Sequence, residues 1–441
     1  MRKTQHLLVF NYICVFKKQL MKLEGNAYQI QGIDVLQMVK EHGSPLFVYD
    51  TDVIKRQYSR LNNAITYKHK KLNFACKSLS NVNILRYIHT LGAGLDTVSI
   101  EEVQLGLHAG YSPNEIMYTP NCVSFEEITT AVELGVRINI DNLSILEHFG
   151  HLYGNRYPVC IRLNPHIMAG GNHKISVGHI DSKFGISIHQ MRHLERIIKA
   201  YDINVNGLHM HTGSDILNID AFKSAVDILL DCARSFEDLD FIDFGSGFKV
   251  PYEPNDLSTD IETFGEEMSK LFEEFCKEYG KELTMEFEPG KYLVSESGTF
   301  FTTVNVLKQT PATVFAGVNT GFNHFIRPMF YDAYHHMVNV SNPNGKPRIY
   351  TVVGYICETD TFGWDRQIEE IKEGDVLAFK NAGAYVFAMA SNFNSRLKPA
   401  EVMVINGQAH VISKRQEFKD LLANQVELNT EILHSQIAEV E

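Results

Sequence analysis

The chain of 441 residues is longer than one ordinary domain, and its composition, 44% hydrophobic and 21% charged, is that of a globular protein. Its formal net charge of -12 argues against nucleic acid as a partner, because proteins that neutralise phosphates carry a surplus of Lys and Arg. We therefore expect small molecules or protein chains as partners. Seven cysteines, an odd number without metal-ligand spacing, indicate reduced thiols and a cytoplasmic location.

Residues 1–20 combine a basic start with a short apolar run. The run is far shorter than the ~20 residues that a membrane span requires. No small-residue cleavage site follows it, so the sequence predicts neither a membrane span nor a signal peptide. We hypothesise that Met21 is the native start, which mass spectrometry of the native N-terminus tests.

From residue 45 to residue 294, short apolar runs rich in β-branched residues alternate with amphipathic stretches. The runs are 72–77, 93–99, 116–121, 137–142, 159–164, 207–213, 241–247 and 284–290. Eight strands separated by helices over roughly 250 residues indicate a (β/α)8 TIM barrel, although a doubly wound sheet gives the same alternation. Two of the expected helices begin with a capping-box pattern, at Ser99 to Glu102 and at Ser124 to Glu127.

The segments outside this region differ in character. Four β-rich stretches, 300–310, 346–358, 374–385 and 401–412, predict a mostly β domain over residues 295–415. Residues 21–44 precede the barrel and are expected to join that β domain. The tail, 416–441, has a helical pattern. The expected fold class is therefore α/β plus β, a TIM barrel with a mostly β C-terminal domain.

Polar and glycine residues gather where the barrel strands are expected to end. They are Lys77, Asp96, Arg162, His211, Gly245 and Glu288. In a barrel, functional residues lie at the C-terminal ends of the strands. Their distribution therefore favours the barrel over the doubly wound sheet.

The stretch HMHTGSD (209–215) contains two histidines that could be part of a metal site. His209 and His211 face the same way if both lie on a strand. A metal site needs at least three ligands, and the third would have to come from Asp243 or Glu288. A structural histidine is the simpler interpretation, and a metal-dependent barrel hydrolase stays open as an alternative.

Three other features each allow more than one interpretation when they are considered alone. Lys77 is either a Schiff-base lysine or a lysine that emerges at a strand end. The tripeptide from Gly245 to Gly247 can present backbone N–H groups to an anion. Glu288 is either a partner for a protonated ring nitrogen or a salt-bridged glutamate. Together with a flat histidine, they form the set that pyridoxal phosphate needs.

Several motifs extend this interpretation to a resemblance. FACKSLSN (74–81), HMHTGS (209–214), FGSG (244–247) and EPGK (288–291) resemble motifs of the barrel-type pyridoxal-phosphate decarboxylases of fold type III, which have an alanine-racemase-like two-domain architecture. The resemblance runs from about residue 21 to beyond residue 405, and it is greatest to the members that act on diaminopimelate. It implies pyridoxal 5'-phosphate as cofactor, with Lys77 bonded to it and His211 stacked on its ring, and no metal. The cofactor-binding residues that it implies are Lys77, Asp96, Arg162, His211, Ser214, Gly245, Gly247, Glu288, Gly290 and Tyr385.

The β domain carries the remaining motifs. FIRPMFYDAYH (325–335), YICE (355–358) and GAY (383–385) resemble the family's substrate segments. The resemblance implies that Cys357 is a catalytic proton donor in the site of the other subunit, and hence that the protein is a homodimer with shared sites. The substrate-binding residues that it implies are Lys291, Arg327, Tyr331, Glu358 and Tyr385. Lys291 stands where the family usually has arginine.

The function implied by the resemblance is decarboxylation of meso-2,6-diaminopimelate to L-lysine and CO2, the last step of lysine biosynthesis. Glutamate at position 358, rather than the aspartate usual in relatives acting on ornithine, favours this substrate. A related decarboxylase for ornithine, arginine or carboxynorspermidine is the alternative. A catalytically silent homologue is a further one, which retention of Lys77, His211 and Cys357 disfavours.

Overall fold

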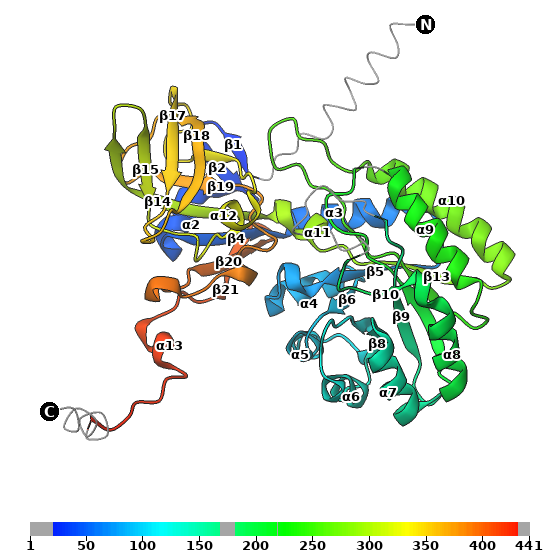
Figure 1. Cartoon of the computed structure of the whole chain (residues 1–441). Coiled ribbons are helices and arrows are strands. Elements are labelled where there is room, and N and C mark those ends of the chain that lie inside the picture. The colour runs from blue at the N-terminus through cyan, green and yellow to red at the C-terminus, as the bar shows by residue number, and fades with distance from the viewer. Residues whose placement is uncertain (1–20, 168–180, 218, 431–441) are drawn as a thin grey trace, which may run out of the picture.

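A computed structural model describes residues 21–167, 181–217 and 219–430, which form two domains side by side (Figure 1). The hypothesis about residues 1–20 and the last part of the tail, 431–441, lie outside the described residues. Within the ranges that the structure describes, no helix is both long and apolar enough to cross a membrane.

The larger domain is a closed barrel of eight parallel strands, as the sequence predicts. The strands are neighbours in the order β9, β11, β12, β13, β5, β6, β7 and β8, and β8 pairs with β9 to close the ring. Their bounds are β5 (Lys70–Ala75), β6 (Gly94–Thr97), β7 (Ile116–Tyr118), β8 (Arg137–Ile140), β9 (Val159–Asn164), β11 (Val205–His209), β12 (Phe241–Asp243) and β13 (Thr284–Phe287). A short strand, β10 (Ile186–Ser187), adds to β9 on the outside of this path.

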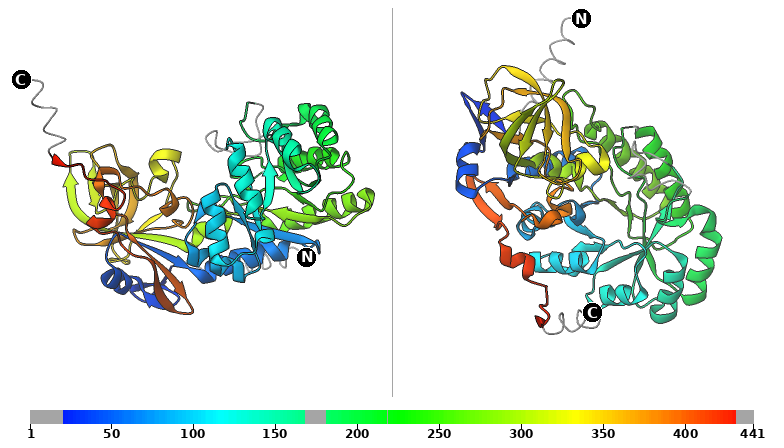
Figure 2. Two further views of the ribbon diagram at one scale, coloured as in Figure 1. Left: turned by 90° about the horizontal axis from the view of Figure 1, so that it is seen from below. Right: turned by 60° about the vertical axis from the view of Figure 1, so that its left-hand side comes forward.

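Helices surround the barrel, with apolar faces against the strands (Figure 2). They are α3 (Thr51–Ala64), α4 (Val82–Thr90), α5 (Ile100–Ala109), α6 (Phe125–Glu133), α7 (Leu143–Tyr153), α8 (Met191–Tyr201), α9 (Ile219–Ala233) and α10 (Ile261–Tyr279). The serine half of each expected capping box is present, because the hydroxyl of Ser99 accepts the N–H of Glu102 at 3.2 Å and Ser124 caps α6 in the same way. The carboxylate of Glu102, however, accepts the N–H of Val98 at 2.8 Å.

The second domain is a β sheet whose main path runs β18, β17, β15, β14, β4, β20 and β21, with β19 and β16 attached to β14. The bounds are β4 (Leu46–Asp50), β14 (Gly298–Gln309), β15 (Val314–Val318), β16 (Met337–Asn339), β17 (Pro347–Val353), β18 (Thr361–Glu369), β19 (Val376–Phe379), β20 (Ala400–Ile405) and β21 (Gln408–Ser413). Alternate residues of its strands pack into two core clusters, with Leu46, Val48 and Phe301 in one and Phe47, Tyr49 and Phe300 in the other.

The N-terminal segment crosses from one domain to the other. β4 pairs antiparallel with β14 and parallel with β20, so it belongs to the β domain although the sequence-based boundary at residue 45 assigns it to the barrel. Residues 22–34 form a small sheet of β1 (Lys22–Glu24), β2 (Ala27–Ile30) and β3 (Ile33–Asp34), followed by α2 (Val35–His42). Apolar residues of this segment share a core cluster with β4, β14 and β20. The β domain is therefore discontinuous in sequence.

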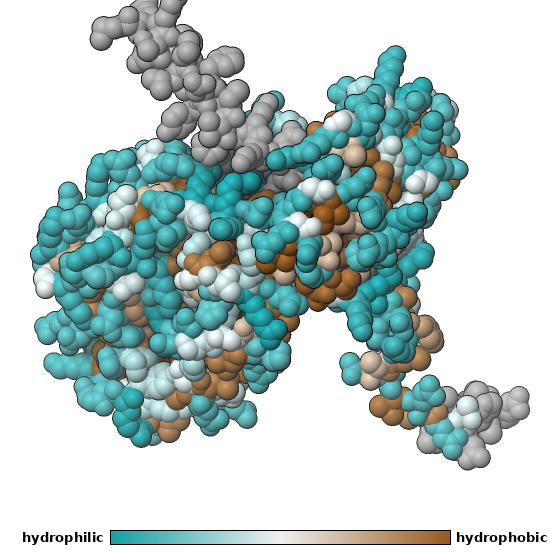
Figure 3. All heavy atoms as spheres, turned by 180° about the vertical axis from the view of Figure 1, so that it is seen from behind, coloured by the Kyte–Doolittle hydropathy of each residue, from teal (hydrophilic) through white to brown (hydrophobic). Residues whose placement is uncertain are grey.

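The C-terminal segment extends away from the sheet (Figures 1 and 2). Within its described part, 416–430, α13 (Phe418–Leu422) is followed by residues without helix as far as 429, so the expected helical tail is interrupted there. Seen from behind, the molecule is mostly hydrophilic, with hydrophobic residues gathered near the junction of the two domains (Figure 3).

Candidate active site

A cavity of about 840 Å³ lies between the C-terminal ends of the barrel strands and the β domain. Because parallel strands end at one rim, residues far apart in sequence meet there. Ten of the residues predicted to bind cofactor or substrate line this cavity, namely Lys77, Asp96, Arg162, His211, Ser214, Glu288, Lys291, Arg327, Tyr331 and Tyr385, and so does His209. Gly247 and Gly290 line a small adjoining cavity, and Gly245 lies in the same loop as Gly247.

Lys77 follows β5 directly, in the short 3-10 helix η1 (Cys76–Ser78), and its side chain faces the cavity. Burial acts to lower the pKa of Lys77, but the neighbouring Asp96, Tyr385 and Glu288 outweigh it, so the pKa is raised. The backbone N–H of Tyr385 donates to the carbonyl of Ser78 at 2.9 Å. This bond ties the GAY turn of the β domain to the loop that carries Lys77.

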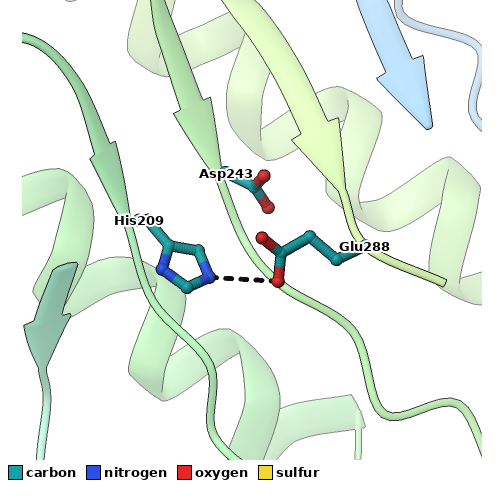
Figure 4. A group of neighbouring side chains, drawn as sticks. All are labelled: His209, Asp243 and Glu288. Atoms are coloured by element: carbon teal, nitrogen blue, oxygen red, sulfur yellow. Dashed lines mark hydrogen bonds and ion pairs between the residues drawn. The ribbon is translucent and has the colours of Figure 1, made fainter. Parts of the chain in front are cut away.

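Glu288 follows β13 and meets His209, the last residue of β11 (Figure 4). Nε2 of His209 lies 3.2 Å from Oε2 of Glu288, while Oε1 of Glu288 is buried without a hydrogen-bond partner among the described residues. Burial acts to raise the pKa of Glu288, but its contact with His209 and the charge of Lys77 outweigh it and hold the pKa at about 2. Glu288 is thus an ionised carboxylate with one oxygen free to accept a proton donor.

His209, Asp243 and Glu288 also meet the spacing for a metal site, because one ligand atom of each lies within 4.8 Å of the others (Figure 4). Both ring nitrogens of His209 are engaged, however. The amide of Asn139 donates to Nδ1 at 2.7 Å, which leaves Nε2 to carry the hydrogen that is shared with Glu288. Without a free lone pair, His209 is a hydrogen-bonded structural histidine, so the geometry supports the simpler interpretation of HxH.

His211 lies beyond the end of β11, against the glycine loop that follows β12. The backbone N–H of Ser246 donates to Nδ1 of His211 at 3.3 Å. Burial and the positive charges of Lys77 and Arg162 lower the pKa of His211 to about 3, so the ring is neutral. A flat neutral ring beside Lys77 suits stacking against an aromatic cofactor.

The two glycines of this loop have no room for a side chain. Gly247 has a φ of +135°, and a Cβ there would lie 2.1 Å from the carbonyl oxygen of Gly213. Gly245 has a φ of +64°, and a Cβ there would lie 2.6 Å from the carbonyl oxygen of Met210. This close approach, the unpartnered oxygen of Glu288 and the cavity-facing Lys77 together fit a group with an anionic end, a ring nitrogen and an aldehyde.

The two cations predicted to bind substrate carboxylates differ in their partners. Lys291, the first residue of α11 (Lys291–Val294), forms an ion pair with Asp215, a cavity residue that the sequence analysis missed although it ends the quoted motif. Arg327 begins α12 (Arg327–Tyr331) and is buried, and its Nε donates to His335 at 3.3 Å. No carboxylate pairs with Arg327 among the residues described.

A second cavity residue that the sequence analysis missed is Tyr252, whose ring lies 5.2 Å from the guanidinium of Arg327. It follows the glycine loop by five positions in a segment without strand or helix pattern, so only its proximity to that loop could have pointed to it.

Cys357 and Glu358 do not reach this cavity. Both side chains are exposed in the loop between β17 and β18, and neither is among the described residues that line the site. Sγ of Cys357 lies 3.2 Å from the amide nitrogen of Asn394. The site of a single chain therefore holds the expected cofactor residues but not the expected proton donor.

The family described as "Pyridoxal-dependent decarboxylase, pyridoxal binding domain" matches residues 51–295, which places the chain in that class of enzyme. Its cofactor is therefore pyridoxal 5'-phosphate, as the sequence predicts. The diaminopimelate decarboxylase of Methanothermobacter thermautotrophicus is 37% identical over 406 residues, covering 90% of this chain and 95% of the relative. The chain belongs to the diaminopimelate decarboxylase family.

Solved structures of the family have the same two-domain fold. The diaminopimelate decarboxylase of Helicobacter pylori, complexed with L-lysine, matches with a TM-score of 0.81 and 30% identity, covering 88% of this chain and 98% of that one. The enzyme of M. jannaschii, also in complex with L-lysine, matches with a TM-score of 0.85 and 26% identity over 92% of this chain and 98% of that one. The expected TIM barrel with a separate β domain is thus confirmed.

Proposed function

We propose that this enzyme is a carboxy-lyase that converts meso-2,6-diaminopimelate, at its D-configured centre, to L-lysine and CO2. The observation that carries the substrate is Arg327, a buried cation of the cavity without a carboxylate partner among the described residues. Ornithine and arginine have one carboxylate, which leaves as CO2. Diaminopimelate keeps a second one, and a buried guanidinium needs such a partner. Relatives named for this activity and crystallised with L-lysine support the same substrate.

Each residue at the barrel rim has a distinct task in this proposal. When bound, the cofactor supplies an electron sink for the electron pair left as the carboxylate departs. Lys77 holds the cofactor, and the ionised Glu288 keeps a positive charge at the ring nitrogen. His211 packs on the ring without adding charge. The loop containing Gly245 and Gly247, with Ser214 and Gly290, binds the phosphate.

Other cavity residues complete the binding of cofactor and substrate. Asp96 faces Lys77 and raises its pKa, and Arg162 adds a buried cation to the rim. Arg327 and Tyr331 bind the substrate carboxylate that remains, and Tyr385 contacts cofactor or substrate. Lys291, with its charge already balanced by Asp215, contacts the same region.

We further propose a homodimer in which the loop bearing Cys357 and Glu358 completes the site of the other subunit. Both side chains are exposed and remote from their own cavity, as a donor loop for a partner requires. Cys357 returns a proton to the product carbon, and Glu358 binds the distal ammonium of the substrate. The six described cysteines are all free, which is consistent with the cytoplasm as the location.

The substrate assignment is tested by CO2 release from meso-diaminopimelate, measured beside ornithine, arginine and carboxynorspermidine with added cofactor. We expect turnover of diaminopimelate alone. Turnover of one of the other amines instead would overturn the role given to Arg327 while keeping the chemistry. No turnover of any of them would favour a silent homologue.

The shared site is tested by mixing two inactive variants, Lys77→Ala and Cys357→Ala. Random association makes half of the dimers hybrids, each with one intact site, so activity should recover to about a quarter of the wild-type value. The mixture of each variant with itself is the control and should stay inactive. A mixture that never recovers, in a protein shown to exchange subunits, would contradict the shared site.

A further inference from the structure

The loop that carries Cys357 is held by a buried carboxylate. The loop spans residues 354–360 between β17 and β18, and its tip, Cys357 to Thr359, is exposed. Its last residue, Asp360, is only 4% exposed. Because Asp360 is buried beside an exposed tip, its carboxylate is placed to stabilise the loop itself.

Both oxygens of Asp360 accept backbone N–H groups. Oδ1 accepts the N–H of Phe322 at 2.8 Å, and Oδ2 accepts the N–H of Ile356, the residue before Cys357, at 3.1 Å. Burial raises the pKa of Asp360 to about 6 although these two bonds oppose the rise, so the carboxylate is ionised at neutral pH. A carboxylate with two N–H donors is a strong anchor in a buried place.

Backbone bonds reinforce the same anchor. The N–H of Gly354 donates to the carbonyl of Asp360 at 2.7 Å, which closes the loop on itself. The N–H of Tyr355 donates to the carbonyl of Thr320 at 3.0 Å, which attaches the loop to the segment before α12. The loop therefore has a fixed base, and its tip projects from that base.

Two glycines make room for the carboxylate. A Cβ at Gly354 would lie 2.1 Å from Oδ2 of Asp360, and a Cβ at Gly321 would lie 2.8 Å from the same atom. Neither glycine has a left-handed φ, so close packing is what requires glycine: against Asp360 at Gly354, and against both Asp360 and Cγ1 of Ile356, at 2.3 Å, at Gly321. The segment that contains Gly321 and the loop that contains Gly354 thus both pack closely against the carboxylate of Asp360.

We propose that Asp360 is a positioning residue that sets the loop bearing Cys357 and Glu358 for insertion into the site of the other subunit. It touches neither substrate nor cofactor and acts through the backbone of Ile356 and Phe322. The inference rests on the proposed role of Cys357. Without Asp360, two buried N–H groups lose their acceptor and the tip loses its fixed direction.

The first test compares Asp360→Ala and Asp360→Asn with Asp365→Asn, an exposed aspartate of β18, in the full-length holoenzyme. We expect kcat for diaminopimelate to fall about tenfold or more in the two Asp360 variants, because a lost buried acceptor is costly. KM should change little, and the control should match the wild type. The alkylation rate of Cys357, followed by mass spectrometry of its peptide, should change in both Asp360 variants. An unchanged kcat or an unchanged alkylation rate would overturn the proposal.

The second test determines whether Asp360 acts on the site of its own chain or on the site of the other subunit. Asp360→Ala mixed with Lys77→Ala should recover about a quarter of the wild-type activity, because the hybrid has one intact site. Asp360→Ala mixed with Cys357→Ala should not recover, because both defects lie in the donated loop. Recovery of the second mixture would show that Asp360 acts on its own chain's site, through α12, and would overturn the proposal.

Failure of the proposed function is distinguishable from failure of this inference. If Lys77→Ala and Cys357→Ala do not recover when mixed, the shared site is wrong. In that case the alkylation rate of Cys357 still decides whether Asp360 positions the loop.

Discussion

Replacing Lys77 by alanine should lower kcat by at least about a thousandfold, because in the proposed mechanism Lys77 is the amine that holds the cofactor and exchanges with the substrate. Lys77 faces the cavity with a raised pKa, among acidic neighbours that stabilise its positive charge. The visible absorbance of the holoenzyme should also shift, because the cofactor can no longer bond to the protein. Stopped assays and absorbance spectra measure the two effects.

A matched control lies on β5, the strand that precedes Lys77. Lys71 is near the other end of β5, where its Nζ approaches the carbonyl of Asn114, and it is not among the residues that line the cavity. Lys71→Ala should keep both the absorbance and the turnover per folded molecule. Wild-type turnover by Lys77→Ala would contradict the assignment of Lys77 as the lysine that binds the cofactor.

Glu288→Gln should have the second largest effect. Its contact with His209 and the charge of Lys77 hold the pKa of this carboxylate at about 2, so it is charged at neutral pH. A neutral amide cannot hold a ring nitrogen in its protonated form, and the electron sink weakens. We expect kcat to fall by roughly 10²–10⁴-fold while the cofactor stays bound. Because the native pKa is so low, the wild-type rate should show no titration of Glu288 between pH 5 and pH 9.

Glu286→Gln is the contrasting variant, since it changes a buried carboxylate on β13, two residues before Glu288. Glu286 accepts two bonds from Arg137, at 2.7 and 3.0 Å, away from the cavity. Its loss should cost roughly 3 kcal/mol of unfolding free energy without lowering kcat per folded molecule. Thermal unfolding and kinetics together separate the two variants. A Glu288→Gln enzyme with wild-type kcat would contradict the role of that carboxylate.

The local pattern of the sequence was sufficient for the barrel and for most of the cavity residues. A strand buried on both faces appears as a continuous apolar run, and its end is marked by a polar residue or a glycine. Lys77, His211 and Glu288 could therefore be placed at one rim before any coordinates, because parallel strands all end on the same side. The motifs around them carried the resemblance to the family.

Contacts between distant segments could not be predicted in this way. β4 is as apolar as a barrel strand, and only its pairing with β14 and β20, more than 240 residues away, assigns it to the β domain. The pair of Lys291 and Asp215 and the bond between His209 and Glu288 likewise join residues 76 and 79 positions apart. No periodic pattern encodes such partners.

The sequence by itself determined the fold class, the cofactor and the residues that gather at the barrel rim, because these depend on strand ends and short motifs. Only the tertiary structure showed that both ring nitrogens of His209 are hydrogen-bonded, that Arg327 has no carboxylate partner among the described residues, and that Cys357 lies outside the cavity of its own chain. The physical reason is that charge balance and burial depend on which side chains pack together, and that choice is made across the whole fold.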